Sequence, residues 1–558
     1  MDLLTRLLAE LNAALAAHDP EKLRAILILE PPFPPPYLEL IAHLQSEYPG
    51  GEYAAESEER LEELVRDVVG EVAEGEDAEG RPVQGWGQMA GFVAGWMCFI
   101  RDLDVGDLLA TYVGLSELQV KINSALQHPT KGILVLPTLI GYAKVLARVA
   151  IGLDKRPELI RHVLLQGDGD DGRRESLPEK AANVVRQAFI TCLNDRNTAP
   201  GGIKDGRPDG KKVGIYKTAN ICLKVLFQAD KLESCQTIFN NISNSSPPLS
   251  IYPASERVTY LYYLGKFHFS YTRFYEAQLA LQKAYEDSPA DPTCIPQRRL
   301  ILIHLIAANI LLGRFPSEHL YSVPEAHGLR DVFEPLTRAI RKGDLESYRR
   351  ITKLDRSHPS AAFLCRYRMF YQLGNYPEVF LWRSLFRKVF LLTGERGATE
   401  RSAPTLDLHA VTLVFQYFEK RALMSPSLAA ADGGPGRRHI SFVLQDFTLQ
   451  DNYIDPDFEG LPEAQPYTRV PDVAEVECIC ASLIVQGLMN GYISKKSNKF
   501  AVLGTRKAGG DPVRAGWPNV WEVVKKRYED RVFGWRRDGE RTGGGGVIRL
   551  AGARAAGS

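Results

Sequence analysis

Three lysines toward the C-terminal end of the chain have the spacing and setting of a phosphate contact. Lys495, Lys496 and Lys499 lie in or beside the turn-like sequence "SKKSN" (494–498). A lysine that neutralises a phosphate adds a salt-dependent, sequence-independent increment to the affinity for a nucleic acid. Exposed charges are also common in solvated hairpin turns, where they contribute little. The residue types by themselves are compatible with both interpretations.

A second group of cations could extend this surface or pair with acids of a neighbouring helix. Its members are Arg383, Arg387 and Lys388, within a predicted helix, and Arg506 and Lys507, after the turn. Farther on, Trp535 stands among the basic residues of "KKRYED" and "GWRRDGERTGGGG", a mixture of stacking and charge found in proteins that bind single strands. A flexible basic tail explains that segment equally well.

The motifs of common enzymes and metal sites are absent from the sequence or incomplete in it. The sequence has no P-loop, no H-E-x-x-H and no G-x-S-x-G. "GDGDDG" (167–172) is similar to a calcium loop, but Arg173 stands where that loop needs its glycine. Cys478 and Cys480 point to different sides of a predicted helix, so they do not hold zinc by themselves. We therefore expect no enzyme activity, no cofactor and no metal. An enzyme site within the first 180 residues is a further alternative, which would require a pocket with perturbed ionisable groups.

The lysine turn must be held by the elements on either side of it. Asp472 and Glu475 predict a capping-box helix start, an apolar stripe follows, and Gly487 predicts the helix end. The stripe comprises Val476, Ile479, Cys480 and Leu483. Beyond it, Ile493, Phe500 and Val502 follow period two and predict two short strands joined by the turn.

This helix and hairpin form the closing half of a predicted winged helix. Its opening half would be two helices over 378–394 and 406–422, separated from the closing half by an insertion at about 424–470. An unpaired edge strand is a liability that a partner can remove by adding a strand. We therefore expect Ile493, Phe500 and Val502 to lie at a partner interface, although they could equally be core residues.

A stack of helix pairs is predicted over 179–375. The segment 257–289 fits a tetratricopeptide template, with Gly265 and Ala277 at the close approach of two helices and Pro289 at the end. In "RAIRKGDLESYRRI", Gly343 predicts the end of one helix and Asp344 the cap of the next. The expected fold class is an all-α, TPR-like helix-pair stack that ends in a winged-helix subdomain with a small β-hairpin.

The rest of the chain divides by composition. We expect an N-terminal helical segment with a proline-rich spacer at 1–50, an acidic linker at 51–82, a helical region at 83–178, the winged helix at 376–503, and a basic, partly disordered tail at 504–558. Residues 52–80 carry twelve acids, as either a solvated helix or a disordered segment, whereas 504–558 carry twelve Lys and Arg against six acids.

The totals limit the class of protein. Lys plus Arg (68) equal Asp plus Glu (68), so any attraction to nucleic acid must come from local asymmetry. Eight cysteines, mostly inside apolar runs, suggest buried hydrophobes in a reducing compartment. The apolar run at 89–100 is shorter than the roughly 20 residues a spanning helix needs, and no signal pattern opens the chain. We expect a soluble, intracellular protein.

Four segments carry a resemblance to a known family. "WRSLFRKVFLL" at the join and "DVAEVECICASLIVQGLMNGYIS" near the end, after a helical array, resemble the PCI domain shared by the proteasome lid, the signalosome and initiation factor three. Upstream, "RRLILIHLIAANILLGRFPS" and "AIRKGDLESYRR" resemble the branch that contains the PCI subunit of the nuclear transcription-and-export complex two and the signalosome-associated twelfth subunit. The resemblance covers roughly 180–503, and the insertion and tail depart from the family pattern.

The resemblance implies a non-enzymatic scaffold subunit. Its winged helix would pair with a GANP-like PCI scaffold subunit, and a small acidic lid protein of the Dss/Sem type would clasp its helical stack. The paired winged helices would bind RNA or DNA and couple transcription to messenger RNA export at the nuclear pore, without membrane insertion. The nucleus is the implied location, with the cytoplasm as a second one. The alternative is a signalosome-associated subunit that acts in transcription or splicing.

Overall fold

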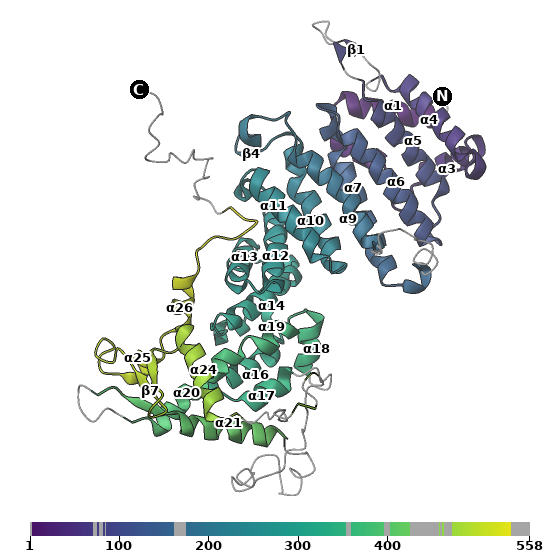
Figure 1. The fold of residues 1–558 in the computed structure, drawn as a ribbon. Helices are drawn as coiled ribbons and strands as arrows, with labels where there is room; N and C mark the ends of the chain where they lie inside the picture. Colours follow the sequence, from purple (N-terminus) through teal and green to yellow (C-terminus); the bar gives the residue numbers. More distant parts are fainter. Residues whose placement is uncertain are drawn as a thin grey trace, which may run out of the picture. The chain divides into compact units, whose positions relative to one another are not determined.

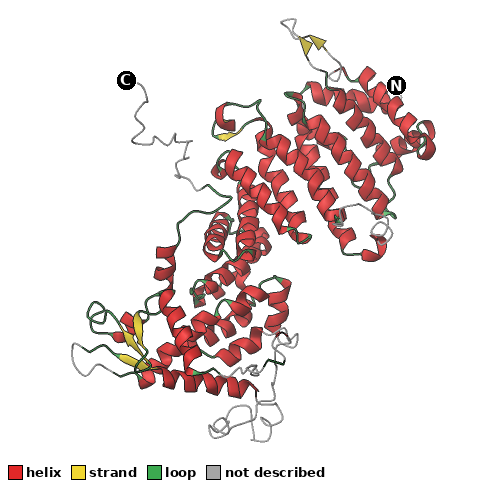
Figure 2. Ribbon diagram, in the orientation of Figure 1, coloured by secondary structure: helices red, strands yellow, loops and turns green. Residues whose placement is uncertain are grey.

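The fold consists of two compact units, mostly helical, with a few short strands (Figures 1 and 2). The computed structural model describes residues 3–70, 75–76, 82–83, 85–160, 175–352, 359–395, 402–423, 457, 460–461 and 471–536. The first unit comprises Met1–Phe267, Glu286–Ser288 and Arg531–Ser558, and the second comprises His268–Tyr285 and Pro289–Asp530. The predicted insertion lies almost entirely outside the described residues, as do segment 167–172 and the glycine run of the tail.

In the first unit, helices pack against their neighbours in the sequence. This holds from α4 through α5, α6, α7, α9 and α10 (Figure 1). Its helices are α1 (Leu3–Ala16), α2 (Pro20–Ile26), α3 (Pro35–Glu47), α4 (Ala54–Val68), α5 (Gly87–Asp102), α6 (Leu108–Leu126), α7 (Leu136–Asp154), α9 (Leu177–Leu193), α10 (Ile215–Gln228), α11 (Leu232–Ser245) and α12 (Ala254–Ser270). Two short hairpins accompany them: β1 (Gly75–Glu76) with β2 (Pro82–Val83), and β3 (Ile203–Lys204) with β4 (Arg207–Pro208).

Within the acidic segment, residues 54–68 form a helix, α4, that packs against its neighbour α5. In α4, Ser57, Leu61 and Val65 are buried, while acidic residues such as Glu56, Glu59 and Glu63 are exposed. The Ser57 hydroxyl donates to the Pro49 carbonyl at 2.8 Å, which fixes the start of the helix. The i, i+4 spacing of the buried positions is a helix signal that the density of charge conceals.

The proline-rich segment is only partly a spacer. α3 begins at Pro35, and proline is tolerated in a first helical turn because the amide hydrogen it lacks would have no partner there. The Tyr37 hydroxyl donates to the Ile26 carbonyl at 2.6 Å, and the Trp96 indole donates to the Ile28 carbonyl at 2.9 Å. The chain around the prolines is therefore bound to the helical core of the first unit.

The second unit is also mostly helical and contains a small sheet. Its helices are α13 (Phe274–Asp287), α14 (Ile295–Leu311), α15 (Glu318–Tyr321), α16 (Leu329–Lys342), α17 (Leu345–Thr352), α18 (Pro359–Arg366), α19 (Phe370–Asn375), α20 (Glu378–Thr393), α21 (Leu408–Leu423), α24 (Val473–Val485), α25 (Pro512–Gly516) and α26 (Val520–Arg527). Its strands are β5 (Thr405–Asp407), β6 (Gly491–Ser494) and β7 (Lys499–Val502).

The local signals at two helix ends are confirmed. Gly343 has a φ of +66° and closes α16, and the Asp344 carboxylate accepts from the Ser347 amide at 3.1 Å to cap α17. The Asp472 carboxylate likewise accepts from the Glu475 amide at 2.8 Å, and α24 is followed by Gly487 at a φ of +67°. Short-range hydrogen bonding decides these boundaries, so the sequence suffices to find them.

The sheet has three strands where the sequence predicts two. All pairings are antiparallel in the order β5-β7-β6, with Leu406 opposite Phe500 and Ile493 opposite Phe500. β7 is therefore the central strand, and among the described strands β5 and β6 form the edges. The three residues of β5 have too short a pattern to be recognised, and their pairing partner lies about ninety residues away.

The cysteines follow the expected pattern only in part. All eight are free, and Cys192, Cys222, Cys235 and Cys480 are buried as small hydrophobes. Cys365 and Cys478 are exposed, contrary to expectation. Cys478 lies on the solvent side of α24, whereas Cys480 lies on its buried side, so the prediction that they point to different sides is confirmed.

Two helical stretches outside 89–100 are long and apolar enough to cross a membrane by length and composition. They are Lys131–Asp154 and Pro292–Leu311. More than half of each apolar window, 61% and 56%, is buried inside the protein. Burial of this kind is the ordinary environment of a core helix, which accounts for their hydropathy.

We predict that Gly343→Ala destabilises the protein. The residue has a positive φ, and a Cβ there would lie 2.8 Å from the Leu385 amide nitrogen, so α16 and α20 would have to separate. Backbone strain and overpacking together should cost about 2–4 kcal/mol, measured as a lower midpoint in urea denaturation. Gly374→Ala is the control, because nothing lies within 4 Å of its added Cβ. Equal effects of the two substitutions would contradict the close approach at Gly343.

Candidate nucleic-acid interface

The turn between β6 and β7 presents two exposed lysines on a fixed backbone. Lys495 and Lys496 are exposed, and within the described part of the chain neither forms an ion pair. The Ser497 hydroxyl lies 2.8 Å from that of Ser494, and Asn498 closes the turn at a φ of +48°. The Asn498 carbonyl accepts from the Leu408 amide at 2.9 Å. The turn is thereby attached to the first residue of α21.

Lys499 differs from its two neighbours because it is paired. Its Nζ lies 2.6 Å from Oε2 of Glu395, and its side chain is 31% exposed. The hydrogen bond from Lys499, together with one from Thr405, holds the pKa of the Glu395 carboxyl below its usual range. The charge of Lys499 is compensated locally, so only Lys495 and Lys496 of the predicted group have no ion-pair partner among the residues that the structure describes.

Arg383 is a structural residue, which removes it from the predicted phosphate surface. Its Nε donates to the Leu488 carbonyl at 3.0 Å and its Nη2 to the Pro518 carbonyl at 2.7 Å. Burial, and secondarily the charge of Arg387, lowers the pKa of the guanidinium to about 10. The side chain joins α20 to the segment after α24 and to the connection before α26.

The other predicted cations are exposed on separate elements. Arg387 and Lys388 lie on the solvent side of α20, whose buried side carries Phe386 and Val389. Arg506 and Lys507 lie in the turn that follows β7, which is closed by a 2.9 Å bond from the Gly510 amide to the Thr505 carbonyl. The structure keeps these four side chains at the surface.

The predicted interface residues divide between core and edge. Phe500 and Val502 are 0% and 2% exposed in the central strand β7, so they belong to the core of this chain and not to a partner seam. Ile493 is half-buried on the edge strand β6. Its neighbour Tyr492, which sequence reasoning missed, is 51% exposed on the same strand.

The beginning of the predicted tail completes this core. The Trp517 ring lies 4.9 Å from that of Phe390 and 6.0 Å from that of Phe500, and it is 5% exposed. The Asn490 side chain donates to the Leu503 carbonyl at 3.1 Å and to the Ala515 carbonyl at 3.3 Å. Residues 504–536 are therefore folded, and the boundary at 503 is wrong. Helix caps at Asp511 and Asn519 were the sequence signals for this segment.

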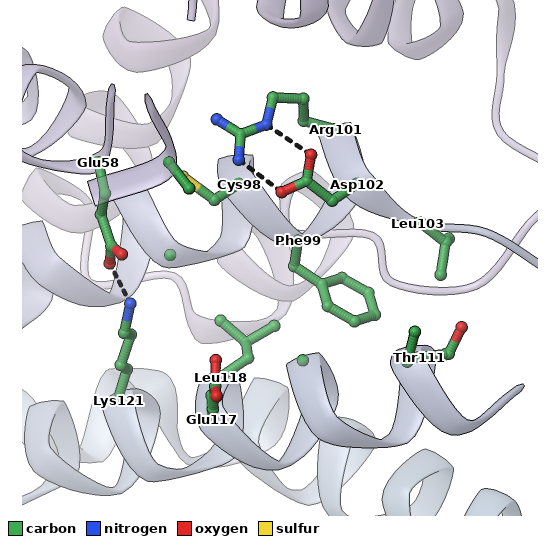
Figure 3. Close-up of a pocket in the computed structure, with 14 residues that line it drawn as sticks. Glu58, Cys98, Phe99, Arg101, Asp102, Leu103, Thr111, Glu117, Leu118 and Lys121 are labelled. Atoms are coloured by element: carbon green, nitrogen blue, oxygen red, sulfur yellow. Dashed lines mark hydrogen bonds and ion pairs between the residues drawn. The ribbon is translucent and has the colours of Figure 1, made fainter. Parts of the chain in front are cut away.

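A separate pocket in the first unit offers the setting for an enzyme site in the N-terminal region (Figure 3). It has a volume of about 270 Å³ and lies between α4, α5 and α6. Four of its ionisable groups form pairs: Lys121 pairs with Glu58, and Nε of Arg101 donates to Asp102 at 2.7 Å. Burial raises the pKa of the Cys98 thiol to about 11, the opposite of what a thiolate nucleophile needs. The pocket supplies no activated nucleophile among its described residues.

We predict that Arg383→Ala destabilises the protein, whereas Arg387→Ala removes a surface charge without a large change in stability. Loss of Arg383 leaves two partly buried carbonyls without their donor and should cost about 2–3 kcal/mol of the free energy of unfolding. Loss of the exposed Arg387 should change it by no more than about 0.5 kcal/mol. Urea denaturation of the two variants and the wild type provides the measurement. A stable Arg383→Ala variant would show that these hydrogen bonds do not hold the subdomain together.

No family model matches the chain, but comparison with known proteins finds relatives named as PCI domain-containing proteins and CSN12 homologs. A PCI domain-containing protein of Schizosaccharomyces pombe is 29% identical over 334 residues, covering 59% of this chain and 60% of that protein. A CSN12 homolog of Neurospora crassa is 26% identical, covering 62% and 64%. PCI domain-containing protein 2 of Xenopus laevis is 25% identical, covering 59% and 64%. The chain thus spans less than two thirds of the length of these relatives.

Proposed function

We propose, from the premise that this chain is a relative of the PCI domain-containing proteins and CSN12 homologs, that it is a non-enzymatic scaffold subunit of a multiprotein complex and binds nucleic acid. The main support for nucleic-acid binding is the β6–β7 turn, which exposes Lys495 and Lys496 on a backbone that is hydrogen-bonded to α21. Two uncompensated cations at the tip of a rigid hairpin suit contact with phosphates, a sequence-independent interaction.

The order of elements supports a winged helix. Helices α20, α21 and α24 precede the β6–β7 hairpin, and β5 adds its short strand to the other side of β7. α20 packs on α21, and α21 on α24, which forms a three-helix body beneath the sheet. In such a body the hairpin is the wing, and its lysine tip can reach a nucleic-acid backbone while α20 and α21 stay packed.

We place the partner seam on β6 and not on β7. Among the described strands, β6 has a neighbour on one side only, and its Tyr492 is half-exposed, as suits an edge that accepts a strand or a packed surface from a partner. The partner would be a GANP-like PCI scaffold subunit, with a small acidic lid protein of the Dss/Sem type on the helical stack. These identities, the role in messenger RNA export and the nuclear, pore-associated location rest on the family resemblance.

The similarity to CSN12 homologs supports a second candidate, a signalosome-associated subunit that acts in transcription or splicing. The two candidates differ in their stoichiometric partners. Purification of the tagged chain from its own cells, followed by mass spectrometry, distinguishes them. A GANP-like scaffold together with an acidic lid protein supports the export function, whereas signalosome subunits support the second candidate. Recovery of the chain without any PCI partner would contradict both.

We predict that Lys495→Ala combined with Lys496→Ala weakens RNA binding by roughly tenfold near 0.1 M salt. The slope of log affinity against log salt should become shallower by about 1.4, since each single-strand phosphate contact contributes about 0.7. Fluorescence anisotropy with a labelled single-stranded RNA measures both quantities. Lys144→Ala combined with Lys155→Ala, two exposed lysines of the first unit, is the matched control. Unchanged affinity and slope in the turn variant would remove the wing tip from the interface.

We predict that Glu395→Gln strengthens RNA binding, the opposite of the effect of the two lysine substitutions. The substitution removes the carboxylate that compensates Lys499, so the turn gains an available cation. Affinity for the same RNA should rise by roughly threefold to fivefold, with a slope steeper by about 0.7. Combining Glu395→Gln with Lys499→Ala should cancel the gain. A rise that persists in the combined variant would show that Glu395 acts by another route.

A further inference from the structure

A short segment near the C-terminus packs against side chains of α11 and α12 in the first unit, and we call the surface that it covers, with Phe239, Tyr260 and Leu264, the groove. Residues 531–536 belong to that unit and form a tight turn, in which the Trp535 amide donates to the Val532 carbonyl at 3.1 Å. Val532 and Trp535 are 5% and 9% exposed. The aromatic–basic segment predicted to stack on single strands therefore has its tryptophan buried in the protein.

The groove selects glycine at the centre of the turn. Gly534 has a φ of +88°, and a Cβ there would lie 2.8 Å from Cδ1 of Leu264 and 3.2 Å from Cβ of Phe239. Its carbonyl accepts from the hydroxyl of the fully buried Tyr260 at 2.5 Å. A side chain at this position would meet both a backbone conformation that L-residues rarely adopt and the wall of the groove.

The flanking residues add two further contacts. The Phe533 ring lies 6.5 Å from that of Phe267 on α12. Nη2 of Arg536 donates to the Asn244 carbonyl at 3.1 Å, at the C-terminal end of α11, where the helix dipole favours a cation. The first unit therefore contacts the segment at five successive positions: an apolar residue, an aromatic residue, an obligatory glycine, a buried tryptophan and an arginine.

We propose that the groove between α11 and α12 is a peptide-binding site. Its ligand class is a short segment of the pattern hydrophobic–aromatic–Gly–Trp–Arg, and its resident ligand is the chain's own segment 532–536. The contacts are those of peptide recognition: a buried aromatic anchor, a steric filter and a charged hydrogen bond near the rim. They involve none of the residues of the candidate nucleic-acid interface, so this site is independent of the proposed function.

Tethering decides when an outside peptide can bind. A segment attached to its own receptor has an effective concentration on the order of millimolar, so it outcompetes a free peptide of similar intrinsic affinity. A free peptide therefore needs a chain whose own segment is weakened but whose groove is intact. Gly534→Ala in the full-length chain meets this condition, because the substitution lies on the ligand and leaves Phe239, Tyr260 and Leu264 unchanged.

The test uses a fluorescein-labelled peptide with the sequence of residues 529–537 and full-length proteins, followed by anisotropy. The peptide should bind Gly534→Ala protein at least about tenfold more tightly than wild-type protein. The same peptide carrying Gly534→Ala should bind neither protein. Limited trypsin digestion reports release of the segment, since Arg531 and Arg536 should be cleaved faster in the variant than in the wild type.

Two results would overturn the proposal. One is a segment that becomes trypsin-sensitive in Gly534→Ala protein while the wild-type peptide fails to bind. The other is unchanged trypsin sensitivity, because the steric filter at Gly534 would then not exist. A second variant guards against misfolding: Tyr260→Phe in the Gly534→Ala chain retains the ring and removes the donor, so peptide affinity should fall by about threefold to tenfold. Circular dichroism melts confirm that each variant is folded.

Discussion

The sheet-bearing part of the second unit depends on one partly buried guanidinium. Arg383 projects from α20 and donates to the carbonyls of Leu488 and Pro518, which lie in segments more than a hundred residues later. Withdrawing a charge from water is costly, and these hydrogen bonds offset that cost only while all three segments stay in register. The guanidinium therefore fixes where α24 ends and where the chain after α25 begins, and with them the position of β6.

Local signals could be predicted from the sequence, whereas long-range burial could not. The caps at Asp344 and Asp472, the αL turns at Gly343 and Gly487, and the hairpin around the lysine turn follow from hydrogen bonds between near neighbours. The strand β5 and the packing of Trp517 on Phe500 depend on segments far apart in the chain. The acidic helix α4 could not be distinguished from a linker because only three of its positions are buried, one of them a serine.

The candidate site shows the same division. The type and exposure of Lys495 and Lys496 could be predicted, because short polar turns between strands stay at the surface. The compensation of Lys499 by Glu395 and the burial of Arg383 could not, since their partners are brought near only by the fold. A cation in the sequence becomes a site for phosphate only after its neighbours in space are known, and a resemblance to a family does not supply them.

The ends of the stretch between α21 and α24 are held by the folded body itself. The Gln416 side chain donates to the Pro471 carbonyl at 3.0 Å, and α21 packs along α24. The hydrogen bond from Gln416 and the packing of the two helices therefore fix the start of α24 against α21, whatever sequence joins them.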